Sequence, residues 1–302
     1  MPELPEVQTI VNDLNKKVVG RKITGVWFDF PKMFKKSPLS LEKIKGKKIL
    51  EVRRRGKNIL VYLSGNLLLL IHQKLTGHLL VGKWEVERKP LRPKGVGVSE
   101  KAIPLFPPEM VNDSYNSYIH IIFYLDNGQM LGLSDLRKFA KVILGKKEEI
   151  ENLPDLKELG TEPLDKDFKF IKFIKLIKPE KRKIKQVLID QEIIAGIGNI
   201  YSDEILWLAK IHPFKPANKL SEKELKSLYA AMKKVLQKAV KMRGTSISDY
   251  RDTAGKKGKY AEIRSVYQRE NEPCKRCKTS IVRVKLGGRS AHYCPACQRL
   301  KP

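Results

Sequence analysis

The sequence predicts a multidomain α+β protein, in which an N-terminal antiparallel β-sandwich is followed by a helical domain and a small cysteine module built on a β-hairpin. Three features favour this organisation. Short strand-like runs fill much of the first half, helical periodicity begins after Leu153 and Pro154, and the four cysteines all lie between Cys274 and Cys297. A chain of 302 residues has room for two domains, or for one domain with small additions.

The first half opens with an amphipathic helix and continues as strands. From Pro5 to Val18 apolar residues recur at helical spacing, so this helix is expected to hold the chain terminus against a core. Turn signals between pairs of apolar runs favour an antiparallel sandwich, with strands at residues 23–28, 48–53, 59–63, 66–72, 118–125 and 130–134. Residues 81–117 are rich in Pro, Lys and Gly and weakly periodic, so we expect an insertion or a mobile loop there.

Helical patterns and a basic loop make up most of the second half. The expected helices cover residues 168–177, 182–189, 199–209 and 222–243. A Ser- and Lys-rich loop over residues 244–260 then leads to the cysteine module. We therefore place domains at residues 1–155, 156–260 and 261–302.

The charge balance points to a polyanionic partner. Lys and Arg number 61 against 33 Asp and Glu, which gives a formal net charge of +28 and a pI near 9.9. Nucleic acid releases condensed counterions when such a surface binds it, although a Lys-rich surface that serves only solubility or heat stability is the alternative. The sequence shows no secretory signal, and its longest apolar run, residues 67–71, is far too short to cross a bilayer. Because no disulfide framework is evident, a reducing cytoplasm is the expected compartment.

The cysteine module has the spacing of a structural zinc site. Two Cys-x-x-Cys knuckles separated by sixteen residues aim four thiolates at one ion, through Cys274, Cys277, Cys294 and Cys297. Four thiolates leave no open position for catalysis, so the expected cofactor is one structural Zn²⁺, which supplies most of the folding free energy of so small a module. Arg289, just after the glycine pair of the predicted hairpin, is a candidate groove or phosphate contact; an ordinary solvated arginine is the alternative.

The N-terminus is a candidate nucleophile. Removal of Met1 exposes the secondary amine of Pro2, and such an amine attacks an aldehydic carbon to give an iminium ion that promotes elimination. Glu3 and Glu6 lie one helical turn apart if the helix starts this early, so that both carboxyls can serve the amine, one as general acid and one as orienting partner. Lys57 is a candidate second acid or phosphate contact. The alternative is that the glutamates only complement the helix dipole.

The chain resembles the formamidopyrimidine-DNA glycosylase and endonuclease VIII family over nearly its entire length, apart from the stretch after Val81. The residues that carry the resemblance are the terminal string MPELPEV, the Arg-x-Gly-Lys turn that ends at Lys57, the segment from His72 to Gly77, and the run from Asp135 to Phe139. The resemblance implies a two-layer β-sandwich, a helix-two-turn-helix domain and a zinc finger, with DNA in the cleft between the halves. It supports the N-terminal amine as the nucleophile.

Residues 183–204 resemble the helix-two-turn-helix segment of that family. Gly196 and Gly198 are expected to let the backbone approach a DNA phosphate at a helix start, where free N–H groups and the helix dipole favour an anion. Lys185 and Asn199 are the expected side-chain contacts to DNA. A nucleotide-binding loop is the rival interpretation, but no Gly-Lys-Ser/Thr follows.

The resemblance also implies that the damaged nucleotide is flipped out of the duplex, that Leu75, Arg137 and Phe139 fill the vacancy, and that His72 contacts the DNA. The alternative is that Leu75 and Phe139 are ordinary core residues, which their strand context permits. Two positions depart from the family pattern: Leu75 stands where purine-repair members usually have Met, and Ala140 where they usually have Gly.

The loop from Thr245 to Tyr260 resembles the one with which purine-specific members cap flipped 8-oxoguanine, although Gln268 and Asn271 beyond it replace the usual glycines. It favours a bifunctional DNA glycosylase and AP lyase that excises oxidised purines and formamidopyrimidines and cuts by β,δ-elimination. An endonuclease VIII-type enzyme for oxidised pyrimidines and a non-catalytic zinc-ribbon DNA-binding protein remain alternatives. The expected partner is double-stranded DNA with oxidised bases or abasic sites, bound by a monomer at the nucleoid and away from membranes.

Overall fold

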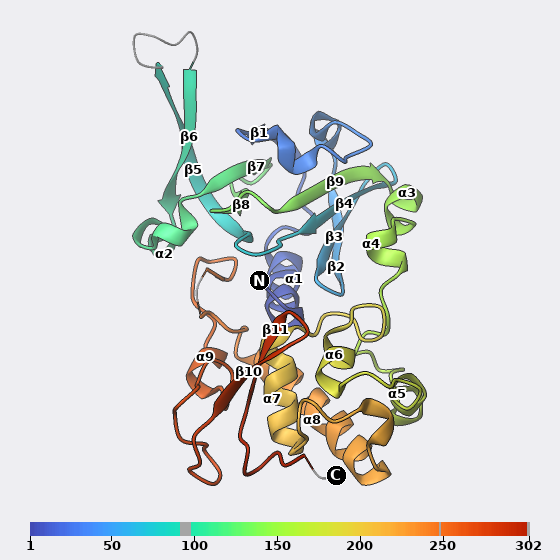
Figure 1. Cartoon of the computed structure of the whole chain (residues 1–302). Helices are drawn as coiled ribbons and strands as arrows, with labels where there is room; N and C mark the ends of the chain where they lie inside the picture. The colour runs from blue at the N-terminus through green and yellow to red at the C-terminus, as the bar shows by residue number, and fades with distance from the viewer. Residues whose placement is uncertain (91–97, 248, 301–302) are drawn as a thin grey trace. The chain divides into compact units, whose positions relative to one another are not determined.

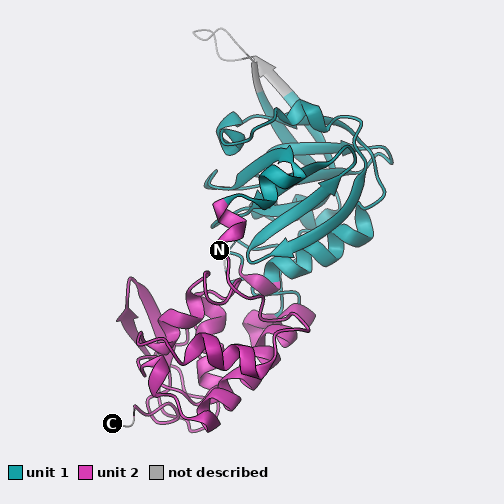
Figure 2. Cartoon of the chain, turned by 90° about the vertical axis from the view of Figure 1, so that its right-hand side faces the viewer, with its two compact units in different colours: residues 1–2, 6–153, 243–259 teal, residues 3–5, 154–242, 260–302 magenta. Residues whose placement is uncertain are grey.

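The computed structural model describes residues 1–90, 98–247 and 249–300, which form two compact units (Figure 2). Unit 1 comprises residues 1–2, 6–153 and 243–259, and unit 2 comprises residues 3–5, 154–242 and 260–302. The segment 243–259, which the sequence groups with the helices, thus packs with the N-terminal strands. The three-domain division at residues 155 and 260 stays a prediction.

Unit 1 is built on two antiparallel sheets, and the predicted α+β class with an N-terminal sandwich is confirmed (Figure 1). One sheet has the strand order β1-β7-β8-β5-β6, and the other has the order β2-β3-β4-β9. Each predicted strand is present to within two residues at either end. The strands are β1 (Ile23–Phe28), β2 (Ile49–Arg55), β3 (Asn58–Leu63), β4 (Leu67–His72), β5 (His78–Pro90), β6 (Val98–Phe106), β7 (Ile119–Leu125), β8 (Met130–Ser134) and β9 (Lys141–Lys146).

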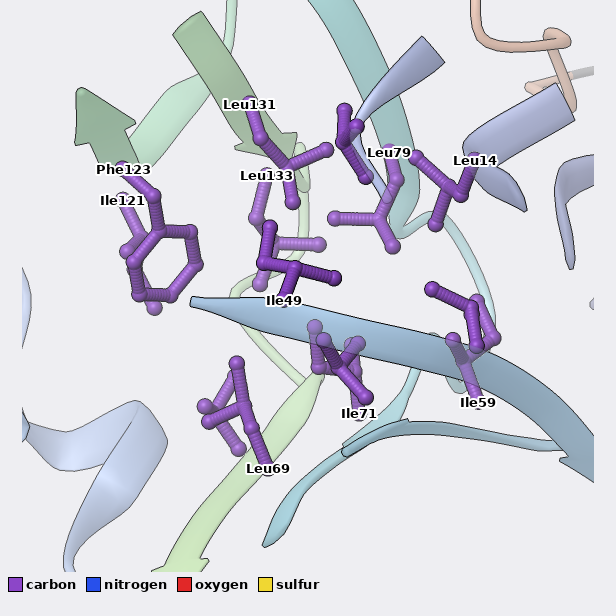
Figure 3. Packing of buried hydrophobic residues seen from close by; sticks show 14 of the residues in the cluster. Leu14, Ile49, Ile59, Leu69, Ile71, Leu79, Ile121, Phe123, Leu131 and Leu133 are labelled. Atoms are coloured by element: carbon purple, nitrogen blue, oxygen red, sulfur yellow. The ribbon is translucent and has the colours of Figure 1, made fainter. Parts of the chain in front are cut away.

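The core of unit 1 takes alternate residues from strands of both sheets (Figure 3). Leu69 and Ile71 of β4 meet Leu131 and Leu133 of β8 there, as the two-residue period of a strand requires. Helix α1 (Leu4–Lys17) adds Leu14, and burial of a side chain of this size contributes about 1.5–3 kcal/mol to stability. The N-terminal helix therefore packs against the core of the sandwich, as predicted.

Most of the described residues between 81 and 117 belong to strands and helices, so a mobile loop over this stretch is wrong there, while an insertion stays a prediction; residues 91–97 lie outside the described part. β5 and β6 pair as a long antiparallel hairpin, followed by α2 (Pro108–Asn112) and the 3-10 helix η3 (Ser114–Asn116). The apolar pattern is weak because β6 is an edge strand of its sheet. Pro104 is tolerated in such a strand because proline has no backbone N–H, and an edge strand has one side where no neighbouring strand needs that donor.

Unit 2 holds the predicted helices and the cysteine hairpin. Its main helices are α5 (Phe170–Ile177), α6 (Ile184–Ile189), α7 (Asn199–Ala209) and α8 (Glu222–Lys241), which share a core of their own. α8 begins at a capping box, in which the hydroxyl of Ser221 accepts from the backbone N–H of Glu224 and the carboxylate of Glu224 accepts from that of Ser221. The hairpin consists of β10 (Val282–Leu286) and β11 (Arg289–Tyr293).

The remaining elements are short. They are α3 (Lys147–Glu151), α4 (Pro154–Lys157) and α9 (Tyr260–Ile263), with the 3-10 helices η1 (Pro31–Phe34), η2 (Leu41–Ile44) and η4 (Ala217–Lys219). A search of the described residues finds no helix with the length and apolar character that a membrane span requires.

Candidate functional site

Glu3 is a buried carboxylate bound at the start of α7. Its oxygens accept hydrogen bonds from the backbone N–H groups of Gly198 at 2.8 Å, Ile200 at 2.8 Å and Tyr201 at 3.3 Å. A Cβ atom on Gly198 would lie 2.4 Å from the Glu3 carboxyl carbon, so only glycine fits this approach. The helix start to which the sequence assigned a DNA phosphate holds the Glu3 carboxylate, which accepts hydrogen bonds from N–H groups that the helix leaves free.

Glu6 has a different partner, within unit 1. Its side chain is 1 % exposed and accepts a hydrogen bond of 2.6 Å from the backbone N–H of Thr245. A Cβ atom on Gly244, which has a φ of +81°, would come within 2.8 Å of this carboxylate. Since α1 begins at Leu4, Glu3 precedes the helix and the one-turn relation to Glu6 expected from the sequence does not apply. Glu6 instead anchors the start of the loop that follows α8.

The other two predicted catalytic residues belong to unit 1. Pro2 is buried and directly precedes the Glu3 carboxylate in the chain. Lys57 is 8 % exposed and lies in the turn between β2 and β3, where Gly56 adopts a φ of +56°. The four predicted catalytic residues are thus all buried: a proline at position 2, two glutamates and a lysine.

Leu75, Arg137 and Phe139 stand in solvent on two loops that are joined to each other. Leu75 is 36 % and Phe139 is 52 % exposed, so the alternative that they are core residues is wrong. The guanidinium of Arg137 lies over the ring of Phe139, with its carbon 4.8 Å from the ring centroid. The surface of unit 1 therefore carries a stacked guanidinium and aromatic ring on one loop and an exposed leucine on the other.

The frame beneath these three side chains is buried. Asp135, which is fully buried, accepts from the hydroxyl of Thr76 and, at 2.7 Å, from the backbone N–H of Ala140. The backbone N–H of Arg137 donates to the Thr76 hydroxyl at 3.1 Å. Thr76 and Asp135 are site residues that the sequence analysis did not single out, although both lie inside the motifs it quoted. His72, at the end of β4, is half-buried, and its Nδ1 accepts from the backbone N–H of Lys74 at 3.0 Å.

Lys185 differs most from its expected position, because its side chain is fully buried rather than available to DNA. Its Nζ lies 2.5 Å from the carboxylate of Asp203 and donates to the carbonyl of Ser290 at 2.6 Å. Burial lowers the pKa of Lys185, and the charge of Asp203 opposes that shift. Asp203 also accepts from the backbone N–H of His292 at 3.0 Å. Lys185 therefore ties α6 and α7 to β11, the strand that starts at the exposed Arg289.

Asn199 is the first residue of α7 and lies within hydrogen-bonding reach of Tyr267. Four and five residues beyond Asn199, the same helix places Asp203 and Glu204 in the interior. The Glu204 carboxylate accepts from the backbone N–H groups of residues 265–267, and burial raises its pKa while these hydrogen bonds oppose the rise. The sequence analysis missed both acids. Their signal was two adjacent carboxylates inside an otherwise apolar helix, which require buried partners.

The positions where the family resemblance expects glycine have unusual backbone angles. Gln268 has a φ of +50° and Asn271 a φ of +67°. Glycine adopts this left-handed region without strain, and asparagine tolerates it better than most residues. The two departures from the family pattern therefore keep the backbone geometry that glycine favours.

The four cysteines converge on one point in unit 2. Their Sγ atoms all lie within 4.8 Å of one another, and individual separations are 3.9 Å for Cys274 and Cys297, 3.4 Å for Cys277 and Cys294, and 3.3 Å for Cys277 and Cys297. Zn–S bonds of about 2.3 Å in a tetrahedron place sulfurs about 3.8 Å apart, so this thiolate set fits one structural Zn²⁺. Trp207 of α7 donates from its ring nitrogen to Cys274 at 3.5 Å, which attaches the centre to the helical core.

Known proteins match this chain in each of its parts. Residues 1–142 match the model of the formamidopyrimidine-DNA glycosylase N-terminal domain, residues 159–251 the formamidopyrimidine-DNA glycosylase H2TH domain, and residues 271–300 a zinc finger found in FPG and IleRS. A formamidopyrimidine-DNA glycosylase of Pelotomaculum thermopropionicum is 39 % identical over 305 residues, covering 100 % of both chains.

Two solved structures of the Lactococcus lactis Fpg protein are similar in fold. One is described as a complex with DNA that contains an abasic site and the other as a complex with DNA that contains an oxidised pyrimidine. Each has a TM-score of 0.81 and 32 % sequence identity, and the match covers 99 % of this chain and 100 % of that chain. The chain belongs to the formamidopyrimidine-DNA glycosylase family.

Proposed function

We propose that this chain is a bifunctional base-excision repair enzyme, a DNA glycosylase and AP lyase that removes oxidised purines and formamidopyrimidines from double-stranded DNA. The observation that carries the proposal is the exposed group formed by Leu75, Arg137 and Phe139 above a buried frame. Large apolar and aromatic side chains gain nothing for folding when they stand in water. They suit a protein that pushes a nucleotide out of a duplex and replaces its stacking.

The proposed chemistry starts at the N-terminus once Met1 has been removed. The nitrogen of Pro2 attacks C1′ of the flipped nucleotide, and the bond from C1′ to the base breaks as the base leaves with the proton of the amine. The bond from C1′ to O4′ then breaks, and O4′ takes up a proton as the sugar ring opens and the C1′–N double bond forms. The resulting iminium ion withdraws electrons, so that loss of a proton from C2′ expels the 3′ phosphate, and a second elimination expels the 5′ phosphate. Both steps conserve the electron count without an added oxidant or reductant.

Each buried acid and base has a proposed role. Glu3, held by three backbone N–H groups, transfers protons to and from the sugar, and Glu6 orients the amine. Lys57 contacts a phosphate or assists as an acid. His72, Asn199 and Arg289 contact DNA, whereas the burial of Lys185 favours a positioning role for this lysine. The zinc finger has a structural role, since four thiolates leave the metal no open position.

Two other functions have support of their own. The Lactococcus protein is described with an oxidised-pyrimidine DNA, which favours some breadth of substrate. The non-enzymatic alternative is a zinc-ribbon protein that only binds DNA, and the net charge of the chain is compatible with it. We place the protein at the nucleoid in the cytoplasm and expect it to act as a monomer.

A panel of duplexes tests the substrate class. Single lesions of 8-oxoguanine, a formamidopyrimidine, thymine glycol and a bare abasic site are placed in one sequence, and incision rates are compared under single-turnover conditions. Purine lesions should be cut at least about tenfold faster than thymine glycol, a difference of about 1.4 kcal/mol in the barrier. Faster incision of thymine glycol supports the endonuclease VIII-type alternative, and no incision of any lesion by zinc-loaded protein supports the binding protein.

A further inference from the structure

The loop of residues 243–259 belongs to unit 1 and is hydrogen-bonded to it at its start and near its middle. At its start, the backbone N–H of Thr245 donates to the Glu6 carboxylate at 2.6 Å. Further along, its Thr253 carbonyl accepts from the backbone N–H of Val81 in β5 at 2.8 Å. Thr253 is fully buried. Position 248 of this loop lies outside the described residues. The loop therefore starts at a candidate catalytic carboxylate and continues along the edge region of the sandwich.

The α2–η3 segment, residues 108–116, supports this loop in addition to helix α1, whose Asp13 accepts from Arg243 and Thr253. Arg251 is 2 % exposed, and its Nε donates to the carboxylate of Asp113 at 2.5 Å. The same guanidinium lies over the ring of Tyr115, 4.9 Å from its centroid. Partial burial alone raises the pKa of Asp113, but the hydrogen bonds from Arg251 and from the Tyr115 backbone lower it overall.

A second connection runs from this loop to the loop that carries Leu75. The side-chain amide of Asn116, fully buried, donates to the carbonyl of Gly255 at 3.3 Å, and its oxygen faces Nε2 of His78 at 3.2 Å. The other ring nitrogen of His78 faces the carbonyl of Thr76 at 3.2 Å. Gly255 has a φ of +80°, and a Cβ atom there would lie 2.8 Å from Asn116. Hydrogen-bonded side chains thus connect the two loops without a break.

We propose that the α2–η3 segment docks the 243–259 loop beside Glu6, and that Arg251, Asp113 and Asn116 are positioning residues that set the preference for nucleotides that still carry a damaged base. This inference rests on the proposed function. In this proposal the loop docked beside Glu6 contacts the base of a flipped nucleotide, whereas a base-free sugar offers it nothing to contact. Loosening the loop therefore slows base excision and spares the cleavage of abasic sites.

Variants of Asp113 and Arg251 separate base excision from the cleavage of abasic sites. Asp113→Asn and Arg251→Met should each lower kcat/KM for 8-oxoguanine excision by about tenfold or more, because the docked loop becomes a minor population. Cleavage of an abasic-site duplex should change less than about twofold in the same preparations. Asp113→Glu, which keeps the charge, should restore most of the excision rate. Lys256→Ala is the matched control, since Lys256 pairs with Glu109 between the same loop and segment but is 58 % exposed.

Hydrogen–deuterium exchange of the free protein reports on docking without any catalysis. Backbone amides of residues 249–259 should exchange faster in Asp113→Asn and Arg251→Met than in the parent protein or in Lys256→Ala. Equal loss of both activities, or faster exchange with unchanged excision, overturns the inference. If the parent protein cuts no lesion at all, the proposed function fails, and unchanged exchange in the two variants then overturns the docking as well.

Discussion

At the scale of single residues, Arg137 and Phe139 are exposed side chains that we expect to matter for DNA binding and not for stability. Their stacked side chains contribute little to the core, so Phe139→Ala should change the free energy of unfolding by less than about 1 kcal/mol. Loss of a stacking ring should slow lesion excision about tenfold or more, because base–aromatic stacking is worth about 1–3 kcal/mol. Denaturant unfolding and single-turnover excision measure the two effects. A variant that is strongly destabilised, or one that excises at the parent rate, contradicts the role assigned to this ring.

Lys185 illustrates the opposite case, a charged residue whose importance lies in the interior. Lys185→Met leaves Asp203 buried without its cation, which should lower the free energy of unfolding by about 3–5 kcal/mol. The double variant Lys185→Met with Asp203→Leu should recover part of that loss, since both charges are then absent. Lys181→Met, at an exposed lysine nearby, is the control. If Lys185→Met is as stable as this control but binds DNA more weakly, the residue contacts DNA directly and the positioning role is wrong.

At the scale of elements, His78 at the start of β5 gives the fold a dependence on pH. Burial lowers the pKa of His78 below 6.5, even though hydrogen bonds to Thr76 and Asn116 oppose the shift. The unfolded chain therefore takes up a proton before the folded chain does. The contribution of His78 to stability is complete above pH 6.5 and is lost as the pH falls from there toward the lower folded-state pKa.

A comparison with His78→Gln isolates this effect, because His212 has a lowered pKa as well. The difference in unfolding free energy between parent and variant should shrink as the pH is lowered from about 8 to 5. Denaturant titrations at a series of pH values measure it. A difference that stays constant over that interval means that His78 does not titrate differently in the two states.

Local patterns predicted most elements, and long-range contacts explain what was missed. Cysteine spacing defined the metal ligands, and the turn signals defined the strands of both sheets. The sequence predicts an insertion or a mobile loop over residues 81–117 because the edge strand β6 lacks the regular apolar alternation of a central strand. The burial of Lys185 depends on Ser290, a partner 105 residues away. Nothing in the local sequence distinguishes such a lysine from one on the surface.

At the scale of the whole molecule, the cysteine centre should control only part of the structure. Zinc removal by a chelator should unfold the module around residues 271–300 and free Trp207 from Cys274, because metal binding supplies about 10–16 kcal/mol in zinc-finger peptides. Unit 1 has a core of its own and should stay folded. Tryptophan fluorescence and limited proteolysis follow both events. A chelated protein with an intact finger indicates that another interaction holds the module.

The central claim is that the nitrogen of Pro2 forms a covalent bond to the sugar of a lesion. Borohydride reduction during the reaction with an 8-oxoguanine duplex tests it most directly, with protein whose intact mass shows that Met1 is absent. The account predicts a stable protein–DNA crosslink at the N-terminal proline, and no crosslink or strand cleavage from protein that retains Met1. Full cleavage by the Met1-bearing form, or a crosslink located at a lysine instead of Pro2, would contradict it.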